Sequence, residues 1–147
     1  KSHLHVTGFF NFTSLLSSPP NLAAFASTLR SWSSSGHTVS LVPQTSSDPS
    51  LYRLLLPLLD AVTYLILSSE EAKGISLRSA EEECLEFFAA RCPSTTVVVT
   101  LGPRGSALVS GGRVTPIPAS RCDKVVDPTG AGDAFAAGFV AGLMKGE

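Results

Sequence analysis

Residues 125–135, VVDPTGAGDAF, are the most informative stretch of this chain. The two valines are typical of a buried strand end, and the apolar residues that follow Asp133 predict a helix. Gly130 and Gly132 lie between them and allow backbone geometries that a side chain would resist. Several N–H groups can therefore converge on one anion, at the positive end of the helix. The stretch predicts a phosphate-binding turn between a strand and a helix.

Asp133 gives this turn a possible chemical role. Beside the terminal phosphate of a nucleotide, a carboxylate can accept the proton of an attacking hydroxyl group. The alternative is that Asp133 is only the N-cap of the helix, a position that favours Asp without any ligand. Short glycine motifs recur by chance, so the spacing alone leaves both interpretations open.

A longer stretch, from Asp127 to Phe139, resembles the C-terminal signature of the ribokinase-like (PfkB) carbohydrate kinases. Three upstream segments are also similar to that family, at residues 5–10, 61–72 and 97–107. The likeness begins in the middle of the family's sequence, and Ser68 replaces the Asn of the family's Asn-x-x-Glu element. The chain thus resembles the nucleotide-binding, catalytic C-terminal part of such a kinase, without the N-terminal half and the lid.

The resemblance implies an ATP-dependent phosphotransferase that acts on a hydroxyl group of a sugar or nucleoside. Asp133 would be the base, and the N–H groups of Gly130, Ala131 and Gly132 would hold the oxyanions of the moving phosphoryl group. The residues expected to contact the nucleotide are Ser68, Thr100, Gly102, Arg104 and Gly105. For the last four, a strand-ending turn without any ligand is the alternative.

The resemblance also implies metal ions. Mg²⁺ accompanies ATP, and Glu71 matches a glutamate that helps to organise Mg²⁺ through water. A glutamate in the first turn of a helix is also favoured by the helix dipole alone. A monovalent cation, K⁺, would be bound partly by backbone carbonyl groups around Asp127 and Thr129.

Short apolar runs alternate with helical patterns along the chain. The strands are predicted at residues 4–8, 38–42, 62–67 and 96–101. Crossover helices are predicted at residues 21–33 and 79–91, the second with Ser79 as its N-cap. Residues 110–113, SGGR, predict a hairpin turn. We therefore expect one α/β domain over residues 1–147, ribokinase-like with Rossmann-type layers, with a mainly parallel sheet and an antiparallel edge hairpin.

Composition narrows the range of partners. A net charge of −1 without a Lys/Arg cluster argues against nucleic acid or a membrane surface and favours a small molecule. Three cysteines form no C-x-x-C pair, and no signal peptide opens the chain, so we expect a reducing, cytoplasmic location. The longest apolar run, at residues 134–144, is shorter than the roughly 20 residues that cross a bilayer. The sequence carries no sign of the oligomeric state.

A nucleotide-binding module or pseudokinase without turnover stays open as a second class. Members of the resembled family recognise their acceptor largely with N-terminal residues and a lid, so we expect the 147 residues alone to be inactive or nearly so. Residues 42–44, VPQ, also stand where such kinases often carry an acidic residue.

Overall fold

The structure is a computed structural model that describes residues 2–146. Its strands are β1 (His3–Thr7), β2 (Thr38–Val42), β3 (Tyr64–Ser68), β4 (Thr96–Thr100), β5 (Ser106–Ser110) and β6 (Arg113–Ile117). Its α-helices are α1 (Thr13–Leu16), α2 (Pro19–Ser34), α3 (Ser69–Ser76), α4 (Glu81–Arg91) and α5 (Ala131–Lys145). Three 3₁₀ segments complete it, η1 (Phe9–Asn11), η2 (Pro49–Leu58) and η3 (Gly102–Arg104).

The strands form one six-stranded sheet in the order β1-β2-β3-β4-β5-β6. Strands β1 to β4 run parallel, whereas β5 and β6 pair antiparallel to the strand before them. Pro116 lies in β6, an edge strand of the sheet, where a residue without an N–H group is tolerated. The predicted α/β class, parallel sheet and edge hairpin are confirmed.

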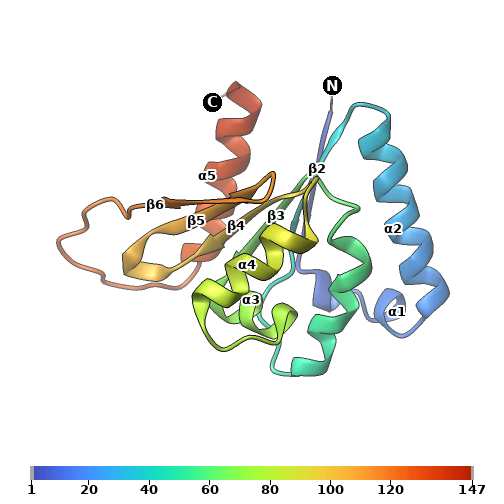
Figure 1. Ribbon diagram of the computed structural model, residues 1–147, viewed down its shortest axis with the longest axis horizontal. Helices are drawn as coiled ribbons and strands as arrows, with labels where there is room; N and C mark the ends of the chain where they lie inside the picture. The colour runs from blue at the N-terminus through green and yellow to red at the C-terminus, as the bar shows by residue number, and fades with distance from the viewer. Residues whose placement is uncertain (1, 147) are drawn as a thin grey trace.

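Helices cover the two faces of the sheet unequally (Figure 1). Val97 and Val99 of β4 join the main core, which lies between the sheet and α2, η2, α3 and α4. Val98 points to the opposite face and packs with Ile66 of β3 and Ala136 of α5. Central strands are thus buried on both sides, as their unbroken apolar runs predict. The face under α5 has the smaller cluster, and only Ala136 of that helix is buried.

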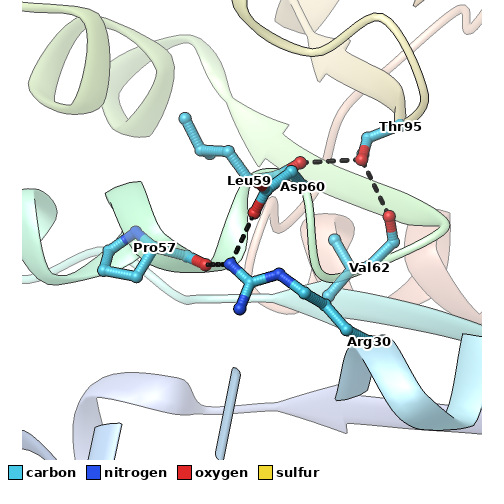
Figure 2. A network of polar contacts seen from close by, with 6 residues as sticks. All are labelled: Arg30, Pro57, Leu59, Asp60, Val62 and Thr95. Atoms are coloured by element: carbon cyan, nitrogen blue, oxygen red, sulfur yellow. Dashed lines mark hydrogen bonds and ion pairs between the residues drawn. The ribbon is translucent and has the colours of Figure 1, made fainter. Parts of the chain in front are cut away.

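A polar network fixes the turn between η2 and β3 (Figure 2). The Thr95 hydroxyl lies 2.7 Å from the carbonyl oxygen of Leu59 and 2.8 Å from that of Val62, so its single O–H can donate to either of two backbone acceptors. Arg30 of α2 donates to the Pro57 carbonyl and to Asp60, each at 2.8 Å. The network ties α2 and the start of β4 to the turn that leads into β3.

Two local predictions are wrong. Helix α4 begins at Glu81 with Ala80 as N-cap and no side-chain cap, so Ser79 does not cap it. Three glutamates in its first turn instead suit the positive end of the helix dipole. Val125 and Val126 do not form a buried strand end, because they belong to no strand and are 69% and 85% exposed.

No helix within residues 2–146 combines the length and the apolar character needed to cross a membrane.

Candidate functional site

The carboxyl ends of three parallel strands meet the N-terminus of α5 at one cavity of about 400 Å³. We call it the turn cavity. Its lining is Val42, Gln44, Thr45, Ile66, Leu67, Ser68, Glu71, Thr100, Pro128, Gly130, Ala131, Gly132 and Asp133. Val42, Ser68 and Thr100 are the last residues of β2, β3 and β4. This is the edge at which open α/β sheets bind their ligands.

The N-terminus of α5 presents free donors to this cavity. Gly130 is the N-cap residue, with the left-handed φ of 76° that glycine adopts most easily, and no side chain caps the helix. The N–H of Ala131, which was expected to hold an oxyanion, instead donates to the Pro128 carbonyl at 3.0 Å, whereas the expected Gly130 N–H meets no acceptor in the described part of the chain. The N–H groups of Gly132 and Asp133 meet no acceptor among residues 2–146. An anion can therefore take up these two donors together with the positive end of the helix dipole.

Asp133 is not the N-cap of α5, which excludes the simplest structural explanation of this residue. It lies in the first turn of the helix, and Gly130 occupies the capping position. Asp133 lines the turn cavity, as do Gly130, Ala131 and Gly132 before it. Asp133 thus combines a helix position favourable to negative charge with access to the cavity.

Asp127 and Thr129 form the approach to this turn. The Thr129 N–H donates to Asp127 Oδ1 at 2.8 Å, and this bond lowers the pKa of the exposed Asp127 carboxyl. The Pro128 carbonyl accepts from Ala131, whereas the carbonyl groups of Asp127 and Thr129 meet no N–H donor in the described part of the chain. Two neighbouring carbonyl oxygens of the segment are therefore free.

Ser68 and Glu71 form a capping box at the start of α3. The Ser68 N–H donates to Glu71 Oε2 at 2.7 Å, and the Glu71 N–H donates to Ser68 Oγ at 3.2 Å. Thr45 donates to Glu71 Oε1 at 3.3 Å, so the carboxylate also holds the loop after β2. Glu71 is 4% exposed, and burial raises the pKa of its carboxyl while hydrogen bonds from Ser68 and Thr45 oppose that rise. The capping role that the helix dipole favours is real, and the same carboxylate lines the turn cavity.

A second cavity of about 470 Å³ adjoins the first. We call it the hairpin cavity. Its lining is Thr100, Gly102, Gly105, Ser106, Ile117, Pro118, Ala119, Ser120, Ala131, Gly132 and Phe135. Thr100, Ala131 and Gly132 line both cavities, so the two form one continuous surface around the start of α5. The structure thus brings Thr100, Gly102 and Gly105 to the predicted site.

Arg104 lies outside both cavities. Its guanidinium pairs with the Glu81 carboxylate at the start of α4, with Nη1 3.1 Å from Glu81 Oε1. Since the Arg104 side chain is 65% exposed, the pair contributes at most about 1 kcal/mol. In this conformation Arg104 joins η3 to α4 and does not reach the phosphate-binding turn.

Two residues with polar side chains that line the turn cavity were absent from the predicted set. Gln44 and Thr45 follow β2, and both line the turn cavity. Their position two or three residues beyond a strand end is the signal that would have found them. Within residues 2–146, no three His, Cys, Asp or Glu side chains gather in a group that could hold a metal ion.

The comparisons with known proteins agree with this arrangement, an α/β domain whose last helix points its N-terminus into a cavity at the carboxyl edge of the sheet. Residues 2–147 match the family model described as pfkB family carbohydrate kinase. The chain therefore belongs to the pfkB carbohydrate kinase family, and the predicted family is confirmed.

The relatives are longer than this chain. It is 41% identical over 98 residues to the inositol 3-kinase of Oryza sativa subsp. japonica. The aligned residues cover 65% of this chain and 20% of that kinase. The adenosine kinase structure from Sinorhizobium meliloti has a TM-score of 0.72 and 27% identity, over 97% of this chain and 42% of that one. The structure of a Vibrio cholerae O395 fructokinase double mutant, bound to fructose, ADP and potassium ion, has a TM-score of 0.74 and 25% identity. The match covers 94% of this chain and 44% of the fructokinase chain. The chain thus spans less than half the length of each of these relatives.

Proposed function

We propose that this chain is the nucleotide-binding, catalytic part of a kinase that transfers the γ-phosphoryl group of ATP to a hydroxyl group of a sugar or nucleoside. One observation carries the proposal. Asp133 and the free N–H groups of Gly132 and Asp133 line the same cavity, at the edge of the sheet where ligands bind. A base and an anion hole on one turn are what phosphoryl transfer requires.

The turn cavity would hold the phosphates. The N–H groups of Gly132 and Asp133 supply the anion hole, and the Gly130-Ala131-Gly132 backbone keeps them in place without side chains in the way. Asp133 accepts the proton of the acceptor hydroxyl while the oxygen of that hydroxyl attacks the γ-phosphorus and the bond from the γ-phosphorus to ADP breaks. Catalysis then depends on positioning and charge stabilisation, both of which the turn supplies.

The hairpin cavity would take the nucleoside part of ATP. Ile117, Pro118 and Phe135 give it apolar walls for a base, and Ser106 and Ser120 add polar groups. Because this cavity shares Thr100, Ala131 and Gly132 with the turn cavity, a nucleotide can lie across both with its phosphates at α5.

The residues present fit the expected ions. Glu71 lines the turn cavity, and Mg²⁺ is commonly bound through one or two carboxylates together with substrate phosphates and waters, so Glu71 would help to organise Mg²⁺ while Asp133 stays free to act as the base. When bound, Mg²⁺ neutralises charge on the phosphates. The free carbonyl groups of Asp127 and Thr129 are oxygen ligands of the kind that K⁺ takes.

A nucleotide-binding module without turnover is the second candidate. It is favoured by the use of Ser68 within its own capping box, at 3.2 Å from the Glu71 N–H, rather than toward a ligand. The chain also matches less than half of each relative, and we expect the 147 residues alone to phosphorylate acceptors slowly or not at all. A preparation that binds ADP and hydrolyses or transfers no phosphate would favour this candidate.

Asp133→Asn tests the catalytic role in a preparation that phosphorylates an acceptor. The change keeps the shape of the side chain and removes its basicity, so kcat should fall by about 10²- to 10⁴-fold. The dissociation constant for ADP should stay nearly unchanged. Asp123→Asn is the matched control, because Asp123 is an exposed carboxylate of the same segment that lines neither cavity. Near-normal turnover of a correctly folded Asp133→Asn variant would rule out the assigned mechanism.

A further inference from the structure

Gln44 stands at the junction of two cavities. It lines the turn cavity and also a third cavity of about 680 Å³, which we call the helix cavity. The lining of the helix cavity is His5, Thr7, Gln44, Asp133, Ala136, Ala137, Val140, Ala141 and Met144. Gln44 and Asp133 are the two residues common to the turn cavity and the helix cavity. A molecule in the helix cavity can therefore meet the phosphate-binding turn only beside this pair.

The backbone of Gln44 adopts an unusual conformation. Its φ is 69°, in the left-handed region that residues other than glycine rarely occupy. Such a conformation costs roughly 1–3 kcal/mol and persists where the surroundings impose it, which is often at a functional site. Asn11, which follows β1, donates from Nδ2 to Gln44 Oε1 at 3.1 Å. This bond holds the oxygen of the amide toward the end of η1.

The other end of the Gln44 amide is free. Its Oε1 atom accepts from Asn11, while Nε2 carries two donors and meets no acceptor within residues 2–146. Gln44 thus offers a donor, and Asp133 offers an acceptor, at the boundary of the same two cavities. A hydroxyl group needs both kinds of partner if its oxygen is to be oriented and its proton removed.

We propose that Gln44 binds the acceptor hydroxyl and turns it toward Asp133. The Nε2–H group donates to one lone pair of the hydroxyl oxygen, and a second lone pair attacks the γ-phosphorus. The hydroxyl proton passes to Asp133 as the new P–O bond forms and ADP leaves with the electrons of the bond that breaks. This inference rests on the proposed function, since it gives the acceptor a place beside the assigned base.

The helix cavity indicates the kind of acceptor. One side is polar, with His5 and Thr7 of β1, and the other is formed by small and apolar residues of α5, including Ala137 and Val140. Ser40 lies beneath the polar side, and its Oγ is 2.7 Å from His5 Nδ1. A ring that carries hydroxyl groups along one edge and presents a less polar face to α5 matches these two walls.

The sequence offers a specific probe, because Gln44 is the only glutamine in the chain. Labelling glutamine with ¹⁵N therefore gives one pair of side-chain amide NMR signals. We would add Mg²⁺ and ADP first, and then myo-inositol or adenosine as the acceptor probe. We expect ADP to shift the backbone signals of Gly132 and Asp133, and the acceptor probe then to shift the Gln44 side-chain pair.

Variants separate recognition from loop geometry. Gln44→Gly adopts the left-handed backbone without strain and lacks the amide, so it should fold at least as stably and bind ADP normally. Its affinity for the acceptor probe should fall by about three- to tenfold, the effect of one lost hydrogen bond. Gln44→Asn keeps an amide on a residue that tolerates the same backbone and should retain part of the affinity. Asn21→Ala is the control, because this amide donates to the Ser14 carbonyl away from the three cavities.

The two proposals fail separately. If ADP leaves the Gly132 and Asp133 signals unmoved, the proposed function is wrong, and the role of Gln44 falls with it. If ADP binds but neither acceptor probe shifts the Gln44 pair, the inference alone is wrong. The inference is also wrong if Gln44→Gly binds the acceptor probe as tightly as the native chain does. It is likewise wrong if Gln44→Gly loses affinity for ADP to the same degree as for the acceptor probe, because Gln44 would then have only a structural role.

Discussion

Gly105→Ala should be one of the most damaging single-methyl additions near the nucleotide site. Gly105 has φ 97° and ψ −129°, a conformation nearly restricted to glycine, which costs another residue roughly 1–3 kcal/mol. A Cβ atom there would also lie 2.6 Å from the Ala119 nitrogen and 2.7 Å from the Pro118 carbonyl carbon. Both neighbours are backbone atoms, so the strand end must move, at a cost of about 1–3 kcal/mol for overpacking. We expect a total loss of about 2–6 kcal/mol in the free energy of unfolding.

Gly102→Ala is the matched control, three residues earlier in the same turn. Its φ of 60° is also left-handed, yet a Cβ atom would meet nothing within 4 Å, so the loss should be only about 1–2 kcal/mol. Urea unfolding of both variants gives the two free energies. Since Pro118 and Ala119 line the hairpin cavity, Gly105→Ala should also weaken ADP binding more than Gly102→Ala does. Equal stability of the two variants would refute the packing argument at the hairpin.

Two further predictions concern buried ionisable groups. Burial raises the pKa of Glu71 in the folded state, so the folded chain binds the carboxyl proton more tightly than the unfolded chain does. The contribution of Glu71 to the free energy of unfolding therefore falls as pH rises from about 4.5 through the raised pKa. Glu71→Gln should therefore gain stability relative to the native chain over that pH range in urea unfolding, and a difference that stays constant with pH would contradict the sign. Cys84 and Cys92 are buried, and burial raises the pKa of Cys92 to about 11, whereas Cys122 is exposed. A thiol reagent at neutral pH should rapidly modify one cysteine in the native chain and all three cysteines in denaturant. Rapid modification of two or three cysteines in the native chain would contradict the burial of Cys84 and Cys92.

The regular part of the fold could be predicted because each signal is local. The apolar run at Thr96–Thr100 forms the expected buried strand, and the turn at 110–113 closes the expected hairpin. The 3₁₀ segment η2 is not among the predicted elements, because Pro57 interrupts its leucine-rich pattern. Leu55 and Leu58 nevertheless place it firmly in the core, at 0% and 1% exposure. Tertiary burial, rather than local preference, decides this segment.

The site was predictable only where one motif carries it. The α5 turn could be found because its glycines and Asp133 are contiguous in sequence. The position of Gln44 just beyond a strand end could have indicated the cavity, but the orientation of its amide could not be predicted. That orientation depends on Asn11, 33 residues away, and a positive φ at a residue other than glycine has no sequence signal. Arg104 illustrates the opposite failure, since its ion pair with Glu81 bridges two elements that the motif does not contain.

The central claim is that the N-terminus of α5 holds the phosphates of a nucleotide, and calorimetric titration with Mg²⁺ and ADP tests it most directly. Gly132 and Gly138 lie on the same helix, and a Cβ atom at either would meet nothing within 4 Å, so a valine side chain starts in open space at both positions. Only Gly132 lines the turn cavity and the hairpin cavity. Gly138→Val should bind ADP as the native chain does, and Gly132→Val should lose the heat of binding. Undiminished ADP binding by a folded Gly132→Val variant would place the nucleotide elsewhere and contradict the claim.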